Sequence, residues 1–294
     1  MRATELEGQR RSARARSRDL WYLLPITALD LVLFIFPMAI MTVVSFLQVH
    51  EFELTRQVTV RNYLFFLGNW VYLRVFLKTV VIAAMVTVVC LILGYPFAYF
   101  LTQISSRWQR TALALVVLPF WTSYLLRVYA WMTILGERGL INKGLLLLGI
   151  VNEPIRFLLY NNAAVVIVSV YLYLPYSALA LYTALERFDR SLVRAAMDLG
   201  ATPVQVFRHI VLPLTLPGVM ASFVFVFIPM LGEFITPTLV GGTEGILIVN
   251  IVVSQLRALR FGIGAAMTLV IASLVVALLI VSRRVVNLER VFGA

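Results

Sequence analysis

The chain has 294 residues, 61% of them hydrophobic and only 13% charged, with a mean hydropathy of +0.93. This composition excludes a soluble domain and predicts a polytopic membrane protein. The net charge of +11 comes from basic residues in short segments between apolar runs, a distribution that encodes membrane topology rather than a nucleic-acid groove. The single cysteine, Cys90, lies in an apolar run and excludes an internal disulfide.

The N-terminal residues 1–20 carry repeated arginines without apolar periodicity. They are predicted to form a cytoplasmic tail, with residues 21–294 forming the transmembrane domain. The apolar run at residues 20–47 admits a signal peptide as a competing interpretation. That run is longer than a signal-peptide core and lacks a small-residue cleavage pattern, so it is predicted to be the first membrane span.

Further apolar runs reach the ~20 residues that a transmembrane helix needs. They cover residues 79–102, 111–135, 163–185, 218–240 and 261–281, which makes six spans with the first. Basic residues are more numerous in the N-terminal tail and the segments on its side of the membrane than in the opposite segments. The positive-inside rule therefore predicts that both termini are cytoplasmic.

The two longer outer segments, residues 48–78 and 137–162, mix apolar, polar and turn residues. They are predicted to cap the bundle, with short helices at 60–66 and 141–148. Their composition is compatible with a docking surface for a partner outside the cell membrane.

Three ionisable residues lie within predicted spans: Asp30, Arg127 and Glu233. Charge in a bilayer is costly, so each is a functional-site candidate, with a structural pair or a snorkelling side chain as the alternative. Counting ~1.5 Å per residue along straight spans places Arg127 and Glu233 at a similar depth in the outer third, where they can pair. Asp30 falls nearer the cytoplasmic half.

Aromatic residues cluster in the third predicted span. Tyr124 and Trp131 flank Arg127 at the spacing that lets rings cover a guanidinium. Trp121, Tyr124 and Trp131 are candidates either for an interfacial belt or for the wall of a translocation path. Phe120 and Tyr129 are predicted to be packing residues.

A basic, helix-forming segment at about residues 186–217 lies between two spans and is predicted to be an amphipathic connector on the membrane surface. Ser191 is the expected N-cap of a first helix, which Gly200 ends. The sequence then predicts a second helix from the capping box of Thr202 and Gln205. The prolines at positions 213 and 217 are expected to stop it.

Several catalytic patterns are absent from the sequence. There is no G-x4-G-K-[ST] phosphate loop, so the chain is not expected to bind or hydrolyse ATP itself. The Gly262-Ile263-Gly264 fragment lacks the setting of a dinucleotide fold, and His50 and His209 fall on opposite faces of the membrane. The sequence therefore predicts neither an enzyme nor a resident metal or cofactor.

The connector also carries the pattern A-A-x3-G-x9-I-x-L-P, which resembles the EAA loop of permease subunits from binding-protein-dependent ABC importers. Arginine stands at position 194, where that motif usually has glutamate. The matching residues are Ala195, Ala196, Gly200, Ile210, Leu212 and Pro213. Further stretches are similar to the polyamine-type branch of these permeases, at residues 118–131, 139–142, 173–176, 184–189 and 231–237.

This resemblance implies an all-α, six-span permease of the type I importer kind in the bacterial inner membrane. It implies a second, homologous permease subunit as heterodimer partner, two cytoplasmic ATPases that bind ATP and Mg²⁺, and an extracytoplasmic solute-binding protein. Coupling to the ATPase is then expected at Ala195, Ala196, Leu199, Gly200, Phe207 and, in an undefined role, Arg194. The substrate pathway is expected to include Glu233, Arg127, Trp121, Tyr124 and Trp131.

Polyamine recognition requires carboxylates for ammonium groups and aromatic faces for the methylene chain, which Glu233 and the third span supply. Similar permeases import opines, aminoethylphosphonate or ferric iron, which remain alternative substrates. An ion-driven secondary transporter is a second alternative, although the two halves show no convincing repeat. An intramembrane enzyme acting on lipid is a third, although no catalytic constellation is present.

Overall fold

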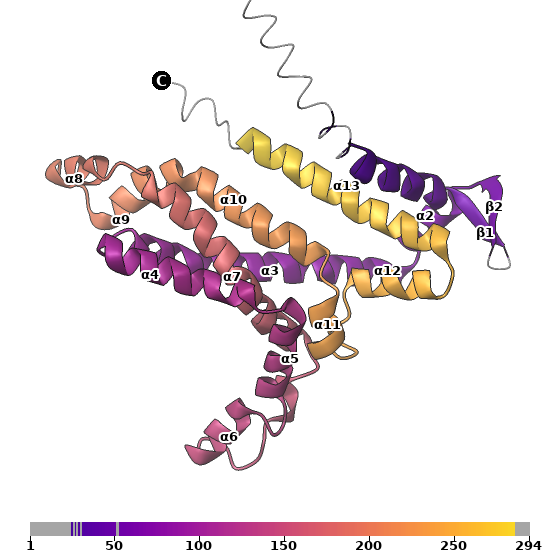
Figure 1. The fold of residues 1–294 in the computed structure, drawn as a ribbon, viewed down its shortest axis with the longest axis horizontal. Helices are drawn as coiled ribbons and strands as arrows, with labels where there is room; N and C mark the ends of the chain where they lie inside the picture. Colours follow the sequence, from indigo (N-terminus) through magenta and orange to yellow (C-terminus); the bar gives the residue numbers. More distant parts are fainter. Residues whose placement is uncertain (1–24, 26, 28, 30, 51–52, 286–294) are drawn as a thin grey trace, which may run out of the picture.

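The computed structural model describes residues 25, 27, 29, 31–50 and 53–285 (Figure 1). The predicted N-terminal tail and Asp30 lie outside the described residues. The order of elements begins with a helix at Leu31–Ser45 and the antiparallel strands β1 (Leu47–His50) and β2 (Glu53–Val58). This hairpin is a small β addition to a fold that is otherwise helical, as predicted.

Three long helices lie side by side and form the main bundle in Figure 1. They are α3 (Trp70–Leu101), α7 (Asn162–Glu186) and α10 (Leu212–Leu231). Small residues allow close packing: a Cβ added to Gly218 of α10 would lie 2.2 Å from the Cβ of Ala184 on α7. The last helix, α13 (Phe261–Val285), packs against α10 and α12 (Ile248–Arg257).

Four helices in the described residues are long and apolar enough to cross a membrane, or five if one bent pair counts as a single span. They correspond to the predicted second, fourth, fifth and sixth spans, and the bent pair to the third. The described part of the predicted first span, Leu31–Ser45, is shorter. The remainder of that span, at residues 20–24, 26, 28 and 30, lies outside the described residues.

The predicted third span, residues 111–135, is not one straight helix. Helix α4 (Ser106–Val117) and the 3₁₀ turn η1 (Leu118–Trp121) are followed by α5 (Tyr124–Leu135). The helical segments Ser106–Trp121 and Tyr124–Leu147 on the two sides of the break are bent by 93° relative to each other. Both the backbone N–H and the hydroxyl of Thr122 donate to the carbonyl of Pro119, at 3.1 and 2.7 Å. This tight closure, with Thr122 in an extended conformation, ends the helix.

The prediction that Pro213 and Pro217 stop the second connector helix is wrong. Helix α9 (Pro203–Val206), the π-helical turn η3 (Phe207–Val211) and α10 form one helical stretch from Pro203 to Leu231. In the π turn, the N–H of Leu212 donates to the carbonyl of Phe207, five residues back. The wider turn accommodates the missing N–H and the ring of Pro213.

The predicted fifth span also breaks before its expected end at residue 240. Helix α10 ends at Leu231, and the short helix α11 (Ile235–Val240) begins after three non-helical residues. The same region of the molecule contains the start of α5 and the middle of α7, which pack against α11. Two interrupted spans, α4–α5 and α10–α11, therefore meet the continuous helix α7.

Both predicted short outer helices are present, as α2 (Arg61–Gly68) and α6 (Leu140–Leu147). Helix α2 lies at the end of the molecule that carries β1 and β2 (Figure 1). The amide of the buried Asn62 donates to the carbonyls of Ser45 and Leu47, at 2.8 and 3.0 Å. It joins α2 to the first helix and to β1.

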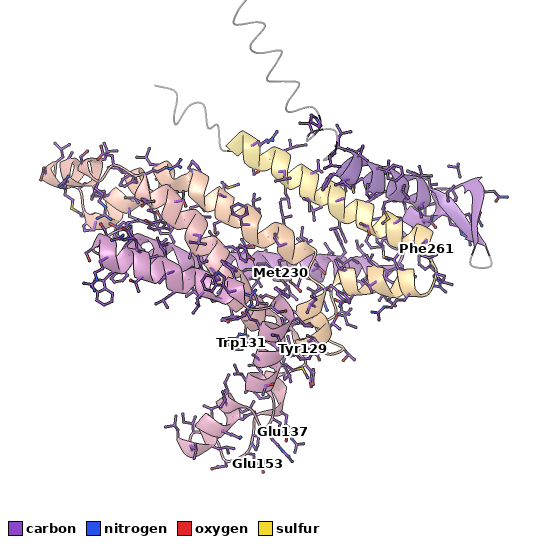
Figure 2. The ribbon with its side chains drawn as sticks, viewed as in Figure 1. Tyr129, Trp131, Glu137, Glu153, Met230 and Phe261 are labelled. Atoms are coloured by element: carbon purple, nitrogen blue, oxygen red, sulfur yellow. The ribbon has the colours of Figure 1, made fainter. Side chains whose placement is uncertain are left out.

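Helices α5 and α6 project away from the main bundle as an arm (Figure 1). The arm comprises residues 124–158 and ends in the 3₁₀ turn η2 (Arg156–Leu158). Figure 2 shows Tyr129 and Trp131 on its first helix, with Glu137 and Glu153 further out. Its distal part has exposed apolar side chains on Leu140, Leu147, Leu148, Ile150 and Phe157.

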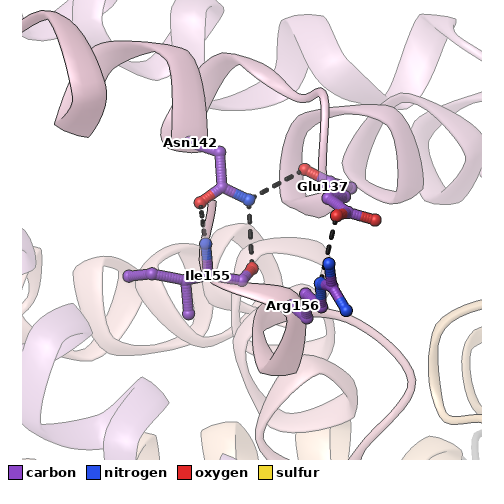
Figure 3. Close-up of polar contacts among 5 residues, drawn as sticks. Glu137, Asn142, Ile155 and Arg156 are labelled. Atoms are coloured by element: carbon purple, nitrogen blue, oxygen red, sulfur yellow. Dashed lines mark hydrogen bonds and ion pairs between the residues drawn. The ribbon is translucent and has the colours of Figure 1, made fainter. Parts of the chain in front are cut away.

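Hydrogen bonds of Asn142, which we call the latch, join helix α6 to Gly136 before it and to Ile155 after it (Figure 3). The fully buried amide of Asn142 donates to the carbonyls of Gly136 and Ile155, at 3.2 and 3.1 Å, and accepts from the N–H of Ile155 at 2.7 Å. An exposed ion pair, Arg156 Nε to Glu137 Oε1 at 3.2 Å, lies beside it. Because the ion pair is exposed, the hydrogen bonds of the Asn142 amide contribute more to the stability of the arm than the ion pair does.

We expect Asn142→Ala to destabilise the distal arm by about 2–3 kcal/mol, because it leaves three partly buried backbone groups without their partner. Amide hydrogen exchange of residues 139–158 should become roughly 30–100 times faster, while exchange in α3 and α7 stays unchanged. Asn152→Ala is the matched control, since Asn152 is an exposed residue of the same arm. Equal exchange rates in the two variants would contradict the role of the latch.

Candidate coupling and translocation sites

The first candidate site is the connector between α7 and α10. Helix α8 (Ser191–Asp198) ends in a Schellman motif, in which Gly200 N–H donates to Met197 O at 2.9 Å and Ala201 N–H to Ala196 O at 3.0 Å. Gly200 has φ +86°, the left-handed conformation that glycine adopts without strain. The predicted corner is therefore present.

The start of α8 differs from the prediction. Ser191 is its first helical residue, and the N-cap position belongs to Arg190, which makes no capping bond. The Oδ1 atom of Asp189 accepts the N–H of Ser191 at 2.8 Å instead. This backbone hydrogen bond lowers the pKa of the Asp189 carboxyl below its usual value. The side chain that caps the start of α8 thus belongs to Asp189, two residues before the predicted cap, Ser191.

The second helix of the connector begins as predicted. The Thr202 hydroxyl accepts the N–H of Gln205 at 3.4 Å, and the Gln205 side chain accepts the N–H of Thr202 at 2.8 Å, which completes the capping box. The Phe207 ring packs edge-on against Tyr95 of α3, with 5.5 Å between ring centroids. Phe207 therefore anchors the connector to the bundle while remaining partly exposed.

The connector presents a mixed surface. Leu199, beside the Gly200 corner, is 89% exposed, and Arg194 and Ala195 are exposed as well. Ala196 lies on the opposite side of α8 and packs with Val193 against the cluster formed by the ends of α3 and α7. Of the predicted coupling residues, Ala196 thus packs α8 against the bundle, and the others remain accessible to a partner.

The second candidate site is a node of hydrogen bonds around Glu233, in the break between α10 and α11. The Oε2 atom accepts the hydroxyls of Tyr124 and Tyr173, at 2.5 and 2.7 Å. The Oε1 atom accepts the N–H groups of Ile235 and Thr236, both at 3.0 Å. Glu233 is 6% exposed, so it caps α11 from a buried position and fastens α11 to α5 and α7.

The predicted pairing of Arg127 with Glu233 does not occur. Among the described residues, the ion pair of the arm is the one that forms. The Arg127 guanidinium lies over the Tyr124 ring, 5.7 Å from its centroid, and its buried Nε has no hydrogen-bond partner in the part of the chain that the structure describes. The depth estimate assumed straight spans, whereas both helices break before reaching these residues.

Aromatic rings continue from this node toward the surface. Tyr173 lies 6.3 Å from Tyr176, which lies 4.7 Å from Phe120. Trp131 packs against Tyr171 of α7 at 5.3 Å, whereas Trp121 is 85% exposed. The packing role predicted for Phe120 agrees with this arrangement. Tyr129 is exposed within this chain, which contradicts its predicted packing role.

Comparison with known proteins identifies the family. The family described as the inner membrane component of binding-protein-dependent transport systems matches residues 73–290. The chain belongs to this family. It is therefore a permease subunit of a type I ABC importer.

Curated relatives of this permease cover most of its length. It is 37% identical to the spermidine/putrescine transport system permease protein PotB of Escherichia coli over 246 residues, which is 82% of this chain and 89% of the relative. It is 38% identical to the protein of the same name from Haemophilus influenzae over 228 residues, or 77% of this chain and 79% of the relative.

The fold of this permease agrees with solved structures. A chain of a bacterial alginate ABC transporter, in complex with a periplasmic protein bound to an alginate pentasaccharide, matches with a TM-score of 0.71 at 14% identity. The match covers 92% of this permease and 95% of that chain. The protein is thus an all-α, multi-pass permease of the inner membrane, a transport subunit rather than an enzyme. Its membership of the family implies a binding protein and an ATPase as partners.

Two residues of the permease were not predicted as site residues. Tyr173 donates directly to Glu233, and the Thr236 hydroxyl lies 3.0 Å from that of Tyr124. A polar hydroxyl in the apolar run of α7, two residues before Pro175, was the available signal for Tyr173. For Thr236 the signal was its place three residues after Glu233, where a carboxylate can cap a helix start.

Proposed function

We propose that this permease forms the translocation pathway of an ATP-driven polyamine importer. The observation that carries the proposal is the 37% identity to spermidine/putrescine permeases over 89% of their length. Aromatic faces suited to a methylene chain support it: Trp121 is exposed, and the series from Phe120 through Tyr176 to Tyr173 leads to a carboxylate. Tyr124, Arg127 and Trp131 complete the proposed wall.

Within this pathway we assign Glu233 to the integrity of the wall rather than to direct contact with substrate. Its oxygens already accept four hydrogen bonds, and it is nearly fully buried. An incoming ammonium would have to displace these donors. Glu233 is therefore a positioning residue that fixes α11 relative to α5 and α7.

The proposed coupling device is the connector formed by α8, the Gly200 corner, α9 and η3. Both termini and this connector are proposed to be cytoplasmic, where a partner ATPase binds ATP and Mg²⁺ and receives the surface around Leu199. No cofactor is proposed on this chain. A second, homologous permease completes the pathway, and ATP-driven closure of the ATPases rocks the two bundles between inward- and outward-facing states.

The test is uptake of labelled spermidine by cells that lack their own polyamine importers. The permease is expressed with its second permease, ATPase and binding protein, and the matched control carries an inactivated ATPase. We expect uptake that requires both the permease and active ATPase and that excess putrescine inhibits. Uptake of an opine, aminoethylphosphonate or ferric iron in place of spermidine would overturn the substrate, and uptake with the inactive ATPase would overturn the mechanism.

A further inference from the structure

A pocket of about 330 Å³ opens beside the N-terminal part of α8, where α3 and α7 end. Helix α8 lies at the end of the molecule opposite to β1 and β2 (Figure 1). The residues that line the pocket are Tyr99, Thr102, Gln103, Leu185, Phe188, Arg190, Val193 and Arg194. None of them belongs to the hydrogen-bond node around Glu233.

Two cations face this pocket without an anionic partner among the residues that the structure describes. Arg190 is held in place because its Nη2 donates to the carbonyl and the hydroxyl of Thr102. Arg194 follows one helical turn later on α8. Neither arginine forms an ion pair with any described residue. The charge of Arg194 contributes to lowering the pKa of the Asp189 carboxyl. That carboxylate, however, accepts the N–H of Ser191 and does not line the pocket.

The neutral lining residues divide into two kinds. The Tyr99 hydroxyl and the Gln103 amide make no hydrogen bond to other described residues, so both are available as donors. Leu185, Phe188 and Val193 give the pocket an apolar side, because they also belong to or pack against the core between the ends of α3 and α7. The pocket therefore offers cationic and neutral donors next to an apolar surface.

We propose that this pocket binds a phosphate-bearing anion, and that the headgroup of an anionic phospholipid supplies it. Guanidinium groups match the geometry of phosphate oxygens, and the donors of Tyr99 and Gln103 add to them. The apolar side suits the glycerol and first methylene groups of a lipid, which a free phosphate lacks. The proposed topology, on which this inference rests, places the pocket at the cytoplasmic leaflet, where anionic lipids concentrate.

A lipid in this position would contact α8 together with the ends of α3 and α7. It would hold the coupling helix against the membrane-spanning bundle without filling the exposed surface at Leu199. The lipid site is thus a place where membrane composition acts on coupling.

The experiment uses the purified complete transporter and a photoactivatable phosphatidylglycerol. We expect saturable labelling of the peptides that contain residues 99–103 and 185–194. Combining Arg190→Gln with Arg194→Gln should lower labelling at least about tenfold, since two charge-assisted contacts are lost. Replacing both arginines by lysine should give an intermediate level, because lysine keeps the charge but not the fork.

Arg107→Gln is the matched control, because Arg107 is an exposed arginine at the start of α4 and lies outside the pocket. It should label like the unchanged protein. If the double glutamine variant fails to assemble, Arg194→Gln alone serves, since that side chain makes no hydrogen bond to a described residue.

Four outcomes would overturn the proposal. Labelling that is equal in the double glutamine variant and the control excludes the pocket. Loss of labelling in millimolar inorganic phosphate, or equal labelling by a phosphatidylcholine analogue, excludes an anionic lipid as the source. Labelling that appears only after removal of the ATPase shows that an acidic side chain of that partner fills the pocket. Transport is not the measurement, so each outcome leaves the proposed polyamine function standing.

Discussion

Replacing Glu233 by alanine is expected to destabilise the permease by roughly 3–5 kcal/mol and to abolish transport. The substitution removes the Glu233 acceptor from two tyrosine hydroxyls and two backbone N–H groups, of which the Tyr124 hydroxyl keeps Thr236 as a second partner. An unsatisfied buried group costs about 1–3 kcal/mol, and losses within one network do not add fully. Glu233→Gln should cost less, about 1–3 kcal/mol, because its one carbonyl oxygen can still accept from α11.

Double-mutant cycles separate the observed node from the pairing that sequence reasoning favoured. Glu233→Gln combined with Tyr173→Phe should show a coupling energy of about 0.5–3 kcal/mol, because the two residues share a hydrogen bond. Glu233→Gln combined with Arg127→Gln should show a smaller coupling energy than that pair, because Glu233 and Arg127 form no ion pair and are linked only indirectly, through Tyr124. The free energy of unfolding in mixed micelles measures both cycles.

The reverse pattern, with Arg127 coupled and Tyr173 additive, would restore the ion pair and contradict the node. Uptake gives a second readout of the positioning role. A positioning residue should change the maximal rate more than the substrate concentration for half-maximal uptake, since the pathway is distorted while the binding protein still delivers substrate. A change confined to the half-maximal concentration would assign Glu233 to direct substrate contact.

The apolar spans were predictable because composition alone determines them. Helix α7 agrees with its predicted bounds to within one residue at each end, and α3 begins nine residues earlier than predicted. Both starts carry a local signal that extends beyond hydropathy. The side chains of Asn69 and Asn161 accept backbone N–H groups of Val71 and Ala164, at 3.0 and 2.8 Å.

The helix breaks were not predictable from the apolar runs. Pro119 lies just before a break, whereas Pro213 and Pro217 lie inside a continuous helix. The difference depends on neighbouring structure, since Thr122 closes a turn on Pro119 while a π turn precedes Pro213. Because the breaks change helix direction, they also decide which side chains meet. The carboxylate node therefore required the structure, although its members Tyr124 and Glu233 were identified from sequence.

The connector shows the same division between local and tertiary information. The corner at Gly200 and the capping box at Thr202 were predicted from residue types, because their chemistry is confined to a few neighbouring residues. A glutamate at position 194, the usual residue of the motif, would be the third residue of a capping box begun by Ser191. Because Ser191 is the first helical residue and Asp189 accepts its N–H, that capping role is not available to a side chain at position 194.

Replacing Gly200 by valine is expected to uncouple ATP hydrolysis from transport. A Cβ at this position meets no atom within 4 Å, so the substitution causes no clash. The backbone, however, has φ +86°, where a side chain costs roughly 1–2 kcal/mol and a β-branched one more. Relief of that strain would open the Schellman motif and displace the exposed Leu199 from its present position relative to α9.

Two controls isolate the corner from general backbone strain. Gly149→Val creates a similar strain at φ +67° in the arm, also with no atom within 4 Å of the added Cβ, and should leave coupling intact. Gly200→Asn should retain most coupling, because asparagine tolerates the left-handed conformation better than valine does. The measurement is stimulation of ATP hydrolysis by the substrate-loaded binding protein in the reconstituted complex.

Arg194→Glu tests whether shape or charge determines this docking. Arg194 is exposed and forms no ion pair with a described residue, so a glutamate there should preserve stimulation if the partner recognises the shape of the corner. Using phosphatidylcholine nanodiscs keeps the proposed anionic-lipid site empty in every variant, which removes its contribution from the comparison. Docking by shape predicts that Gly200→Val loses at least about tenfold in stimulation and Arg194→Glu less than twofold, a difference of more than ~1 kcal/mol. If Arg194→Glu abolishes stimulation while Gly200→Val retains it, the ATPase recognises the charge at position 194 and the shape-based account of the connector is wrong.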